Sequence, residues 1–163
     1  MSTAVLSLGS NLGDRLANLR LAVDGLGEAV RAVSPVYETA PWGVPDQPDF
    51  LNAVLIVSDD TLDEWGWLHR ARELETKAGR VRTQHWGPRT LDVDVVTVDE
   101  VRSADPELLL PHPGTPDRAT VLLPWLAIDP RAELLDRGPI VRLLAALDPA
   151  EVAAVRWFRA EVR

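Results

Sequence analysis

The order of strand-like and helix-like segments over the first hundred residues constrains the fold of this chain more than any other feature. Short apolar or alternating runs, typical of strands, are separated by longer runs whose apolar residues recur at helical spacing. The expected strands are residues 3–8, 30–39, 50–57 and 91–98, and helices are expected from Asp14 and from the capping box Thr61-Leu62-Asp63-Glu64. This order predicts a ferredoxin-like α+β fold, an antiparallel sheet with helices packed on one face.

The rest of the chain is expected to extend this unit with helices. Residues 108–111 form a short extended piece, and helical spacing of apolar residues recurs over 120–128, 140–147 and 151–162. Residues 40–49 contain too much proline for a regular element. Because no linker, repeat or low-complexity stretch interrupts the pattern, we expect one domain over residues 1–163.

Charge and composition exclude several classes of protein. The formal net charge of −8 disfavours binding to nucleic acids and to anionic membranes. The absence of cysteine excludes disulfides and thiolate metal sites. The N-terminus has no basic segment followed by a long apolar run, and no apolar stretch approaches a membrane span. We therefore expect a cytoplasmic protein. A monomer is a separate expectation, which these features do not decide.

One basic segment stands out in this acidic chain. No acidic residue occurs from Thr76 through Leu91, a stretch that contains Lys77, Arg80, Arg82, His85 and Arg89. Guanidinium groups bind phosphate oxygens through paired donors and remain charged, so the segment suits a triphosphate. The alternative is a basic loop that is simply solvated.

Two carboxylates follow the basic segment directly. Asp92 and Asp94 are two residues apart in an expected strand, so both point to one face, roughly 7 Å apart. Val96 and Val98 are expected on the same face, and Leu91, Val93 and Val95 on the other. Two buried carboxylates would repel each other, and Mg²⁺ held with phosphate oxygens removes that cost. The alternative is a structural network of both aspartates with Arg80 or Arg89.

Five motifs in order resemble one known family. They are Leu8-Gly9-Ser10-Asn11-Leu12-Gly13-Asp14, Tyr37-Glu38-Thr39, Gln47-Pro48-Asp49-Phe50-Leu51-Asn52-Ala53, the run from Gly79-Arg80-Val81-Arg82 to Trp86-Gly87-Pro88-Arg89-Thr90-Leu91-Asp92-Val93-Asp94, and Pro111-His112-Pro113. Together they are similar to the 6-hydroxymethyl-7,8-dihydropterin pyrophosphokinases of folate synthesis. No Walker A sequence is present, so ATP would bind by another scheme.

The resemblance implies an ATP-dependent pyrophosphoryl transfer that uses two Mg²⁺ ions, with Asp92 and Asp94 as metal ligands. It implies catalytic roles for Arg80, Arg82, Asp92 and Asp94. For the pterin it implies the residues Thr39, Trp42, Phe50 and Asn52. For ATP it implies the residues Glu75, Arg80, Arg82, His85, Trp86, Arg89, Val95, His112 and Arg118. Independently, Phe50 offers a flat stacking surface, and the Asn52 amide offers both a donor and an acceptor to a heterocycle edge.

Two positions depart from the family pattern. His85 stands where many relatives have arginine, and Thr120 stands where relatives commonly have a second phenylalanine that stacks on the pterin. The implied reaction moves the β,γ-pyrophosphoryl group of ATP to the pterin hydroxymethyl oxygen and releases AMP. The rival functions are a kinase that transfers only the γ-phosphoryl group and a binding module without catalytic activity.

Overall fold

The computed structural model describes residues 1–41, 47–79 and 90–162. Its centre is an antiparallel sheet in which the described strands run in the order β10-β3-β4-β1-β5, with β2 also paired to β4. These six strands are β1 (Ser2–Ser10), β2 (Val30–Val33), β3 (Val36–Thr39), β4 (Phe50–Asp59), β5 (Asp92–Val98) and β10 (Arg156–Arg159). The inner order agrees with the predicted ferredoxin-like arrangement.

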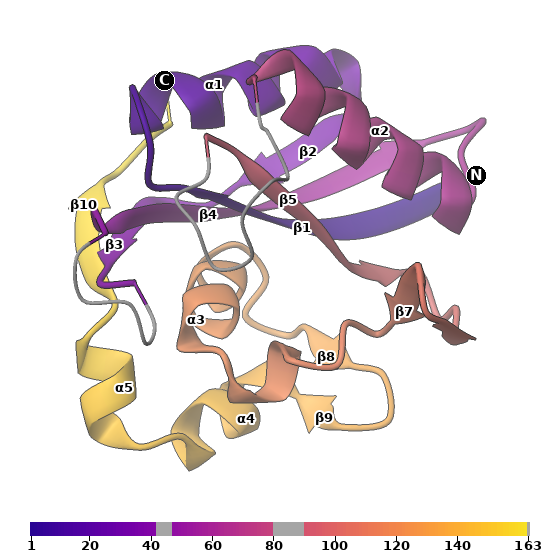
Figure 1. The fold of residues 1–163 in the computed structure, drawn as a ribbon. Helices are drawn as coiled ribbons and strands as arrows, with labels where there is room; N and C mark the ends of the chain where they lie inside the picture. The colour runs from indigo at the N-terminus through magenta and orange to yellow at the C-terminus, as the bar shows by residue number, and fades with distance from the viewer. Residues whose placement is uncertain (42–46, 80–89, 163) are drawn as a thin grey trace.

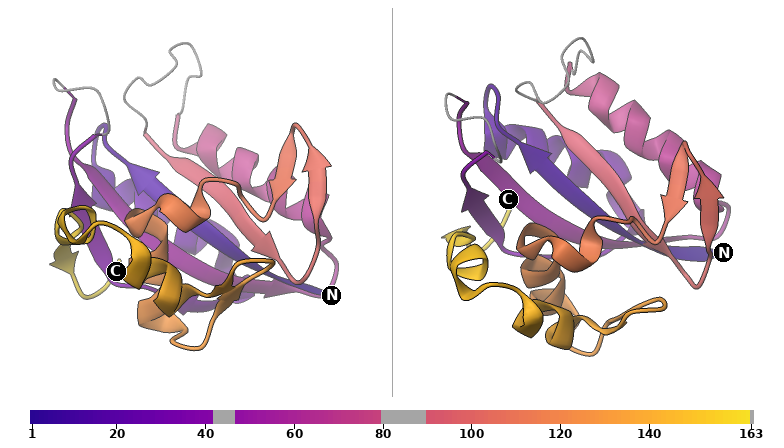
Figure 2. Two further views of the ribbon diagram at one scale, coloured as in Figure 1. Left: turned by 90° about the horizontal axis from the view of Figure 1, so that it is seen from below. Right: turned by 60° about the horizontal axis from the view of Figure 1, so that its bottom comes forward.

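Helices cover both faces of the sheet (Figures 1 and 2). The helices α1 (Arg15–Leu26) and α2 (Glu64–Lys77) lie on one face, while α3 (Ala119–Ile128) packs against the other beside α4 (Ile140–Ala146). The prediction of helices on one face therefore holds for the first hundred residues only. The predicted helices at 120–128 and 140–147 are confirmed as α3 and α4.

Shorter elements complete the chain. Two small hairpins pair β6 (Ser103–Asp105) with β7 (Leu108–Leu110) and β8 (Glu133–Leu134) with β9 (Gly138–Pro139). Single 3₁₀ turns occupy Gly27–Ala29 and Thr115–Asp117, and α5 (Pro149–Ala153) precedes β10. No helix in the described part of the chain is both long and apolar enough to cross a membrane.

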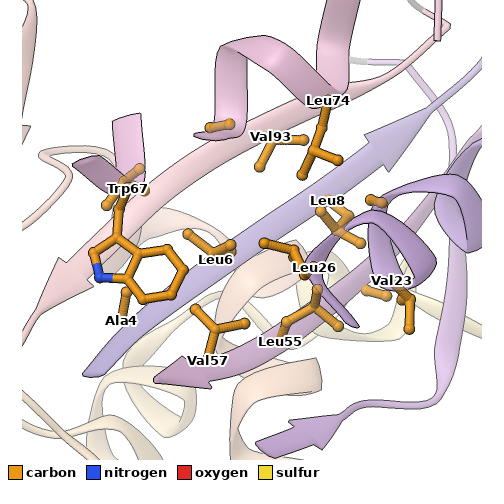
Figure 3. Packing of buried hydrophobic residues seen from close by; sticks show 14 of the residues in the cluster. Ala4, Leu6, Leu8, Val23, Leu26, Leu55, Val57, Trp67, Leu74 and Val93 are labelled. Atoms are coloured by element: carbon orange, nitrogen blue, oxygen red, sulfur yellow. The ribbon is translucent and has the colours of Figure 1, made fainter. Parts of the chain in front are cut away.

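The larger core lies between the sheet and the helices α1 and α2 (Figure 3). Trp67 and Leu74 of α2 and Leu26 of α1 pack on buried side chains of the central strands, among them Leu6 and Leu55. Trp67 has no exposed surface, and its indole N–H donates to the Ser2 hydroxyl at 2.8 Å. A smaller cluster on the opposite face joins Val5, Val54 and Val96 of the sheet to the helices α3 and α4.

The single strand predicted over 30–39 is wrong, because the segment forms two strands. Pro35 has no N–H to donate to a ladder. Ser34 instead makes two hydrogen bonds to β4. Its hydroxyl accepts from the Val54 amide at 2.8 Å, and its own amide donates to the Val54 carbonyl at 2.9 Å. The break lets β2 and β3 both pair with β4.

Two predictions of helix ends are also corrected. The N-cap of α2 is Asp63, whose carboxylate accepts from the Gly66 amide at 2.8 Å, so Thr61 does not cap the helix. Instead, Thr61 donates to Asp59 in a tight turn. The helix predicted over 151–162 ends after one turn as α5, because the following residues pair with β3 as β10.

A bulge in β5 changes which face its last residues occupy. Val95 pairs with Leu6 and Thr97 pairs with Val5, which leaves Val96 as the extra residue. The sequence predicts Val98 beside Val96, but Val98 packs in the larger core on the other face. The bulge reverses the alternation after Val96, so the prediction for Val98 is wrong.

Candidate active site

The acidic pair lies at the start of β5, on the sheet face that also carries Val96. Asp92 is paired with Gly9 of β1, and Asp94 is paired with Ser7. Both aspartates are half-buried. Their separation of two residues puts both carboxylates on one face, as the sequence predicted.

Gly9 is the point where side chains from two neighbouring strands converge. It is paired with Asn52 of β4 on one side and with Asp92 of β5 on the other. A Cβ atom built on Gly9 would lie 3.5 Å from Phe50 Cδ1, 3.7 Å from Asn52 Oδ1 and 3.9 Å from Asp92 Cβ. The bare backbone of Gly9 thus forms a floor between an aromatic ring, an amide and a carboxylate. Sequence reasoning included Gly9 in a motif but assigned it no role.

Thr39 and Asn52 join this group through a hydrogen bond. The Asn52 Nδ2 atom donates to Thr39 Oγ1 at 2.9 Å, and Thr39 is paired with Phe50 across β3 and β4. Thr39 is buried, with 7% of its surface exposed. The bond orients the amide so that Oδ1 lies on the Gly9 side. Three of the four predicted pterin residues therefore adjoin each other, and the fourth, Trp42, lies outside the described residues.

Glu75 reaches the acidic pair from α2. Its side chain is buried, and Oε2 accepts a hydrogen bond from the Val93 amide at 3.0 Å. Val93 lies between the two aspartates, so this bond fixes the backbone on which both are carried. The family resemblance implies that Glu75 helps to order the basic segment for ATP.

His112 and Arg118 approach the acidic pair from the segment after β7. The His112 amide donates to the carbonyl of Val96, the bulged residue of β5, at 2.9 Å. Burial lowers the pKa of His112, and the Arg118 charge lowers it further, while the charge of Asp92 acts in the opposite direction. The His112 ring therefore responds to both the Asp92 carboxylate and the Arg118 guanidinium.

The same histidine is fixed in one neutral tautomer. The Gly114 amide donates to His112 Nδ1 at 3.3 Å, so Nδ1 is the acceptor and the proton lies on Nε2. Gly114 also leaves room for Arg118, because a Cβ on Gly114 would lie 2.7 Å from Arg118 Nε. The neutral imidazole therefore offers one N–H donor beside a permanent positive charge.

Of the remaining residues predicted to bind ATP or to act in catalysis, only Val95 lies in the described part of the chain. The side chain of Val95 is in the larger core with 5% exposed surface, so only its main chain could contact a nucleotide. The other predicted nucleotide or catalytic residues fall outside the described residues, and they are Arg80, Arg82, His85, Trp86 and Arg89.

The donor set fits a hard divalent cation only in part. Asp92 and Asp94 supply carboxylate oxygens, the ligands that Mg²⁺ prefers. Over residues 1–41, 47–79 and 90–162, no group of three or more His, Cys, Asp or Glu side chains could by itself hold a metal ion. Two carboxylates on one face suit an ion that takes its other ligands from phosphate and water.

Two polar side chains missed by sequence reasoning hold the segment that leads into β4. The Asn11 amide nitrogen donates to the Pro48 carbonyl at 3.1 Å and to Gln47 Oε1 at 3.3 Å. Arg15 donates to the Asp49 carbonyl at 3.0 Å. The Asn11 bonds link the first and third motifs of the sequence, and Arg15, which directly follows the first motif, adds a further link across more than thirty residues. The only signal for Asn11 in the sequence is its place inside the first of the motifs that resemble the family.

A family model and two curated relatives that match this chain all carry the description of a hydroxymethyldihydropterin pyrophosphokinase. Residues 5–130 match the family described as 7,8-dihydro-6-hydroxymethylpterin-pyrophosphokinase. The 2-amino-4-hydroxy-6-hydroxymethyldihydropteridine pyrophosphokinase of Mycobacterium tuberculosis (strain H37Rv) is 52% identical over 171 residues, which cover 98% of this chain and 91% of that protein. The enzyme of the same name from Mycobacterium leprae is 53% identical, over 96% of this chain and 88% of the relative.

Solved structures share the fold at low sequence identity. The wild-type HPPK-DHPS of Plasmodium falciparum, solved with SDX-DHP, superposes with a TM-score of 0.64 at 13% identity. The match covers 88% of this chain and 44% of that chain, so this chain spans less than half the length of the solved protein. At this identity the likeness concerns the fold alone.

Proposed function

The chain belongs to the 7,8-dihydro-6-hydroxymethylpterin-pyrophosphokinase family, and we propose that it transfers the β,γ-pyrophosphoryl group of ATP to the hydroxymethyl oxygen of 6-hydroxymethyl-7,8-dihydropterin in folate biosynthesis. The products are AMP and the pterin diphosphate. The observation that carries this proposal is the convergence on Gly9 of Asp92 with Phe50 and Asn52. Asp92, which is proposed to act on the phosphates, thereby adjoins a surface that suits a flat heterocycle.

The pterin is proposed to lie over Gly9, between β4 and the acidic pair. Phe50 offers a ring for stacking, and the absence of a side chain on Gly9 leaves room for a planar molecule. Asn52 keeps Oδ1 and its second N–H for the heterocycle, because one N–H already donates to Thr39. Trp42 is proposed from the sequence to cover the face of the pterin that Thr120 leaves without an aromatic partner.

Asp92 and Asp94 are proposed to hold two Mg²⁺ ions together with the phosphates of ATP. The bound ions would neutralise phosphate charge and align the reacting groups. The two carboxylates supply hard oxygen ligands from one rigid strand, and the bond from Val93 to Glu75 holds that strand in place. Asp92 also lies on the side nearest Asn52 and Phe50, so it is the residue proposed to orient the attacking hydroxyl.

His112 and Arg118 are proposed to bind ATP on the far side of the acidic pair. The neutral His112 presents its Nε2–H as a donor, and Arg118 adds the paired donors of a guanidinium group. From the sequence, Arg80, Arg82, Arg89 and His85 would add cationic or donor groups for the triphosphate, and Trp86 would lie near the nucleotide. Such preorganised donors stabilise the charge that develops during phosphoryl transfer.

Turnover of the purified protein with ATP, Mg²⁺ and the reduced hydroxymethylpterin tests the proposal. We expect AMP and the pterin diphosphate in equal amounts, with no turnover when either the pterin or Mg²⁺ is omitted. ADP as the nucleotide product would instead establish transfer of the γ-phosphoryl group. Binding of both substrates without any product would establish a binding module. A cytoplasmic monomer stays part of the proposal, and sedimentation of the purified protein would test the monomer.

A further inference from the structure

We propose that Arg15 is a positioning residue that holds the pterin-binding ends of β3 and β4 from the opposite face of the sheet. This inference rests on the proposed function, because it assigns Arg15 to the same site. Arg15 is the first residue of α1 and lies outside the group of residues that surround Gly9. Its contacts nevertheless end on the immediate neighbours of two proposed pterin residues.

The Arg15 guanidinium contacts three separate parts of the chain. Its Nη1 atom donates to Glu38 Oε2 at 2.7 Å and to the Asp49 carbonyl at 3.0 Å. The centre of the guanidinium also lies 5.8 Å from the centroid of the Phe158 ring in β10. A single side chain therefore connects the start of α1 to β3, to the entry of β4 and to β10.

The partners of Arg15 are adjacent in sequence to the site. Glu38 precedes Thr39 in β3, Asp49 precedes Phe50 at the start of β4, and Thr39 pairs with Phe50. Successive side chains in a strand point to opposite faces. Glu38 pairs with Leu51, which belongs to the core beneath α1, whereas Phe50 faces Gly9 and Asp92. Arg15 thus holds these strand ends from behind the pterin side.

A second arginine strengthens the same connection. Arg156 of β10 lies 2.9 Å from Asp49 Oδ2 and 3.6 Å from Glu38 Oε1. Arg156 lies beyond residues 5–130, the part that matches the family model, and β10 pairs with β3 at the pterin end of the sheet. The two arginines and the two acidic residues form one charged cluster, which we refer to as the Arg15 cluster.

Partial burial makes the Arg15–Glu38 pair a stronger contact than a surface ion pair. The exposed fractions of the two side chains are 27% and 22%. The Arg102–Asp136 pair has a similar distance of 2.8 Å, but its side chains are 61% and 57% exposed. Exposed pairs contribute little to stability because water and salt screen them. Arg102–Asp136 joins the segment before β6 to the β8–β9 turn and offers a matched control.

Calorimetry on three variants tests the proposal, with 6-hydroxymethylpterin titrated into protein that is saturated with Mg²⁺ and a non-hydrolysable ATP analogue. We expect Arg15→Ala to weaken pterin binding about tenfold, equivalent to about 1.4 kcal/mol, and to leave the Kd of the ATP analogue within about twofold. Arg15→Lys keeps a cation for Glu38 but cannot reproduce both hydrogen bonds, so it should recover part of the loss. Arg102→Ala should change neither affinity.

A change in thermal stability alone would not support a positioning role. If Arg15→Ala lowers the Tm while the pterin Kd stays within twofold of wild type, the proposal is wrong. Should Arg15→Ala fail to fold, Glu38→Gln tests the same contact, and an unchanged pterin Kd in that variant would overturn it. If wild-type protein binds no pterin, the proposed function fails instead, so the two failures are distinguishable.

Discussion

The carboxylate of Glu75 accepts a hydrogen bond from the backbone amide of Val93, and that amide belongs to the residue between Asp92 and Asp94. Glu75 is 4% exposed, so its position depends on the partners it has in the interior. The helix α2 therefore acts on the acidic pair through the main chain of β5. This contact predicts that a buried residue on one face of the sheet controls the carboxylates on the other.

Replacing Glu75 tests that dependence. Glu75→Ala leaves the Val93 N–H buried without this acceptor, which should lower the free energy of unfolding by about 1–3 kcal/mol. Glu75→Gln keeps an acceptor oxygen and should cost about 1 kcal/mol less, because the hydrogen bond loses only its charge. Urea unfolding of the three proteins would measure the difference. Equal losses in both variants would contradict the role of the acceptor.

The acidic pair should be required for activity but not for folding. Asp92→Asn and Asp94→Asn keep the shape of each side chain and remove its charge, so both variants should unfold near the wild-type midpoint. Each should lose on the order of 10²-fold or more in kcat, the scale of removing a group that stabilises charge in a transition state. Turnover at limiting Mg²⁺ is the measurement, and near wild-type activity in either variant would contradict the metal assignment.

From the environment of His112 we predict that the folded protein loses stability as the pH falls. Burial and Arg118 hold the folded-state pKa of His112 below its ordinary value of about 6.5. The unfolded chain then binds more protons than the folded chain as the pH falls from about 7 through 6.5 toward the folded-state pKa, so stability decreases in that window. His112→Asn keeps an acceptor for the Gly114 amide and cannot titrate. Unfolding at pH values of about 7.5 and about 5.5, on either side of the ordinary histidine pKa, should show a smaller acid loss for His112→Asn than for wild type.

Local sequence patterns correctly predicted those helices and strands whose structure depends mainly on residues close by in the sequence. The placement of Asp92 and Asp94 on one face follows from the two-residue period of a strand, and the structure confirms it. Apolar spacing likewise predicted α1 and α3. Val98 was misplaced because the bulge at Val96 depends on the pairing with β1, which a local pattern does not contain.

Contacts between distant segments account for the remaining errors. The C-terminal strand β10 forms because β3 offers an edge to Arg156 and Trp157, and its sequence alone also suits a helix. The convergence of Phe50, Asn52 and Asp92 on Gly9 depends on the register of three strands. The family resemblance identified these residues one by one, but only the structure brings them together around a glycine.

Thr120 offers a prediction about pterin affinity. Thr120 is the second residue of α3, on the sheet face that carries the acidic pair. An aromatic pair contributes about 0.5–1.5 kcal/mol beyond the burial of its area, so Thr120→Phe should tighten pterin binding modestly. Calorimetry with the pterin would measure the gain. An unchanged Kd in a folded Thr120→Phe protein would mean that another side chain, for which Trp42 is our candidate, already covers that face.

Replacing Gly9 should separate an effect on pterin binding from an effect on folding more clearly than any other substitution. A methyl group at this position would meet Phe50, Asn52 and Asp92 at 3.5 Å or more, which is ordinary contact distance, so Gly9→Ala should fold with little change in its free energy of unfolding. The same methyl group would occupy the space over which the pterin is proposed to lie. We therefore expect Gly9→Ala to weaken pterin binding strongly while the ATP analogue binds as in wild type. Chemical unfolding and calorimetry with each ligand would measure the three quantities. Wild-type pterin affinity in the folded variant would place the pterin elsewhere on the sheet.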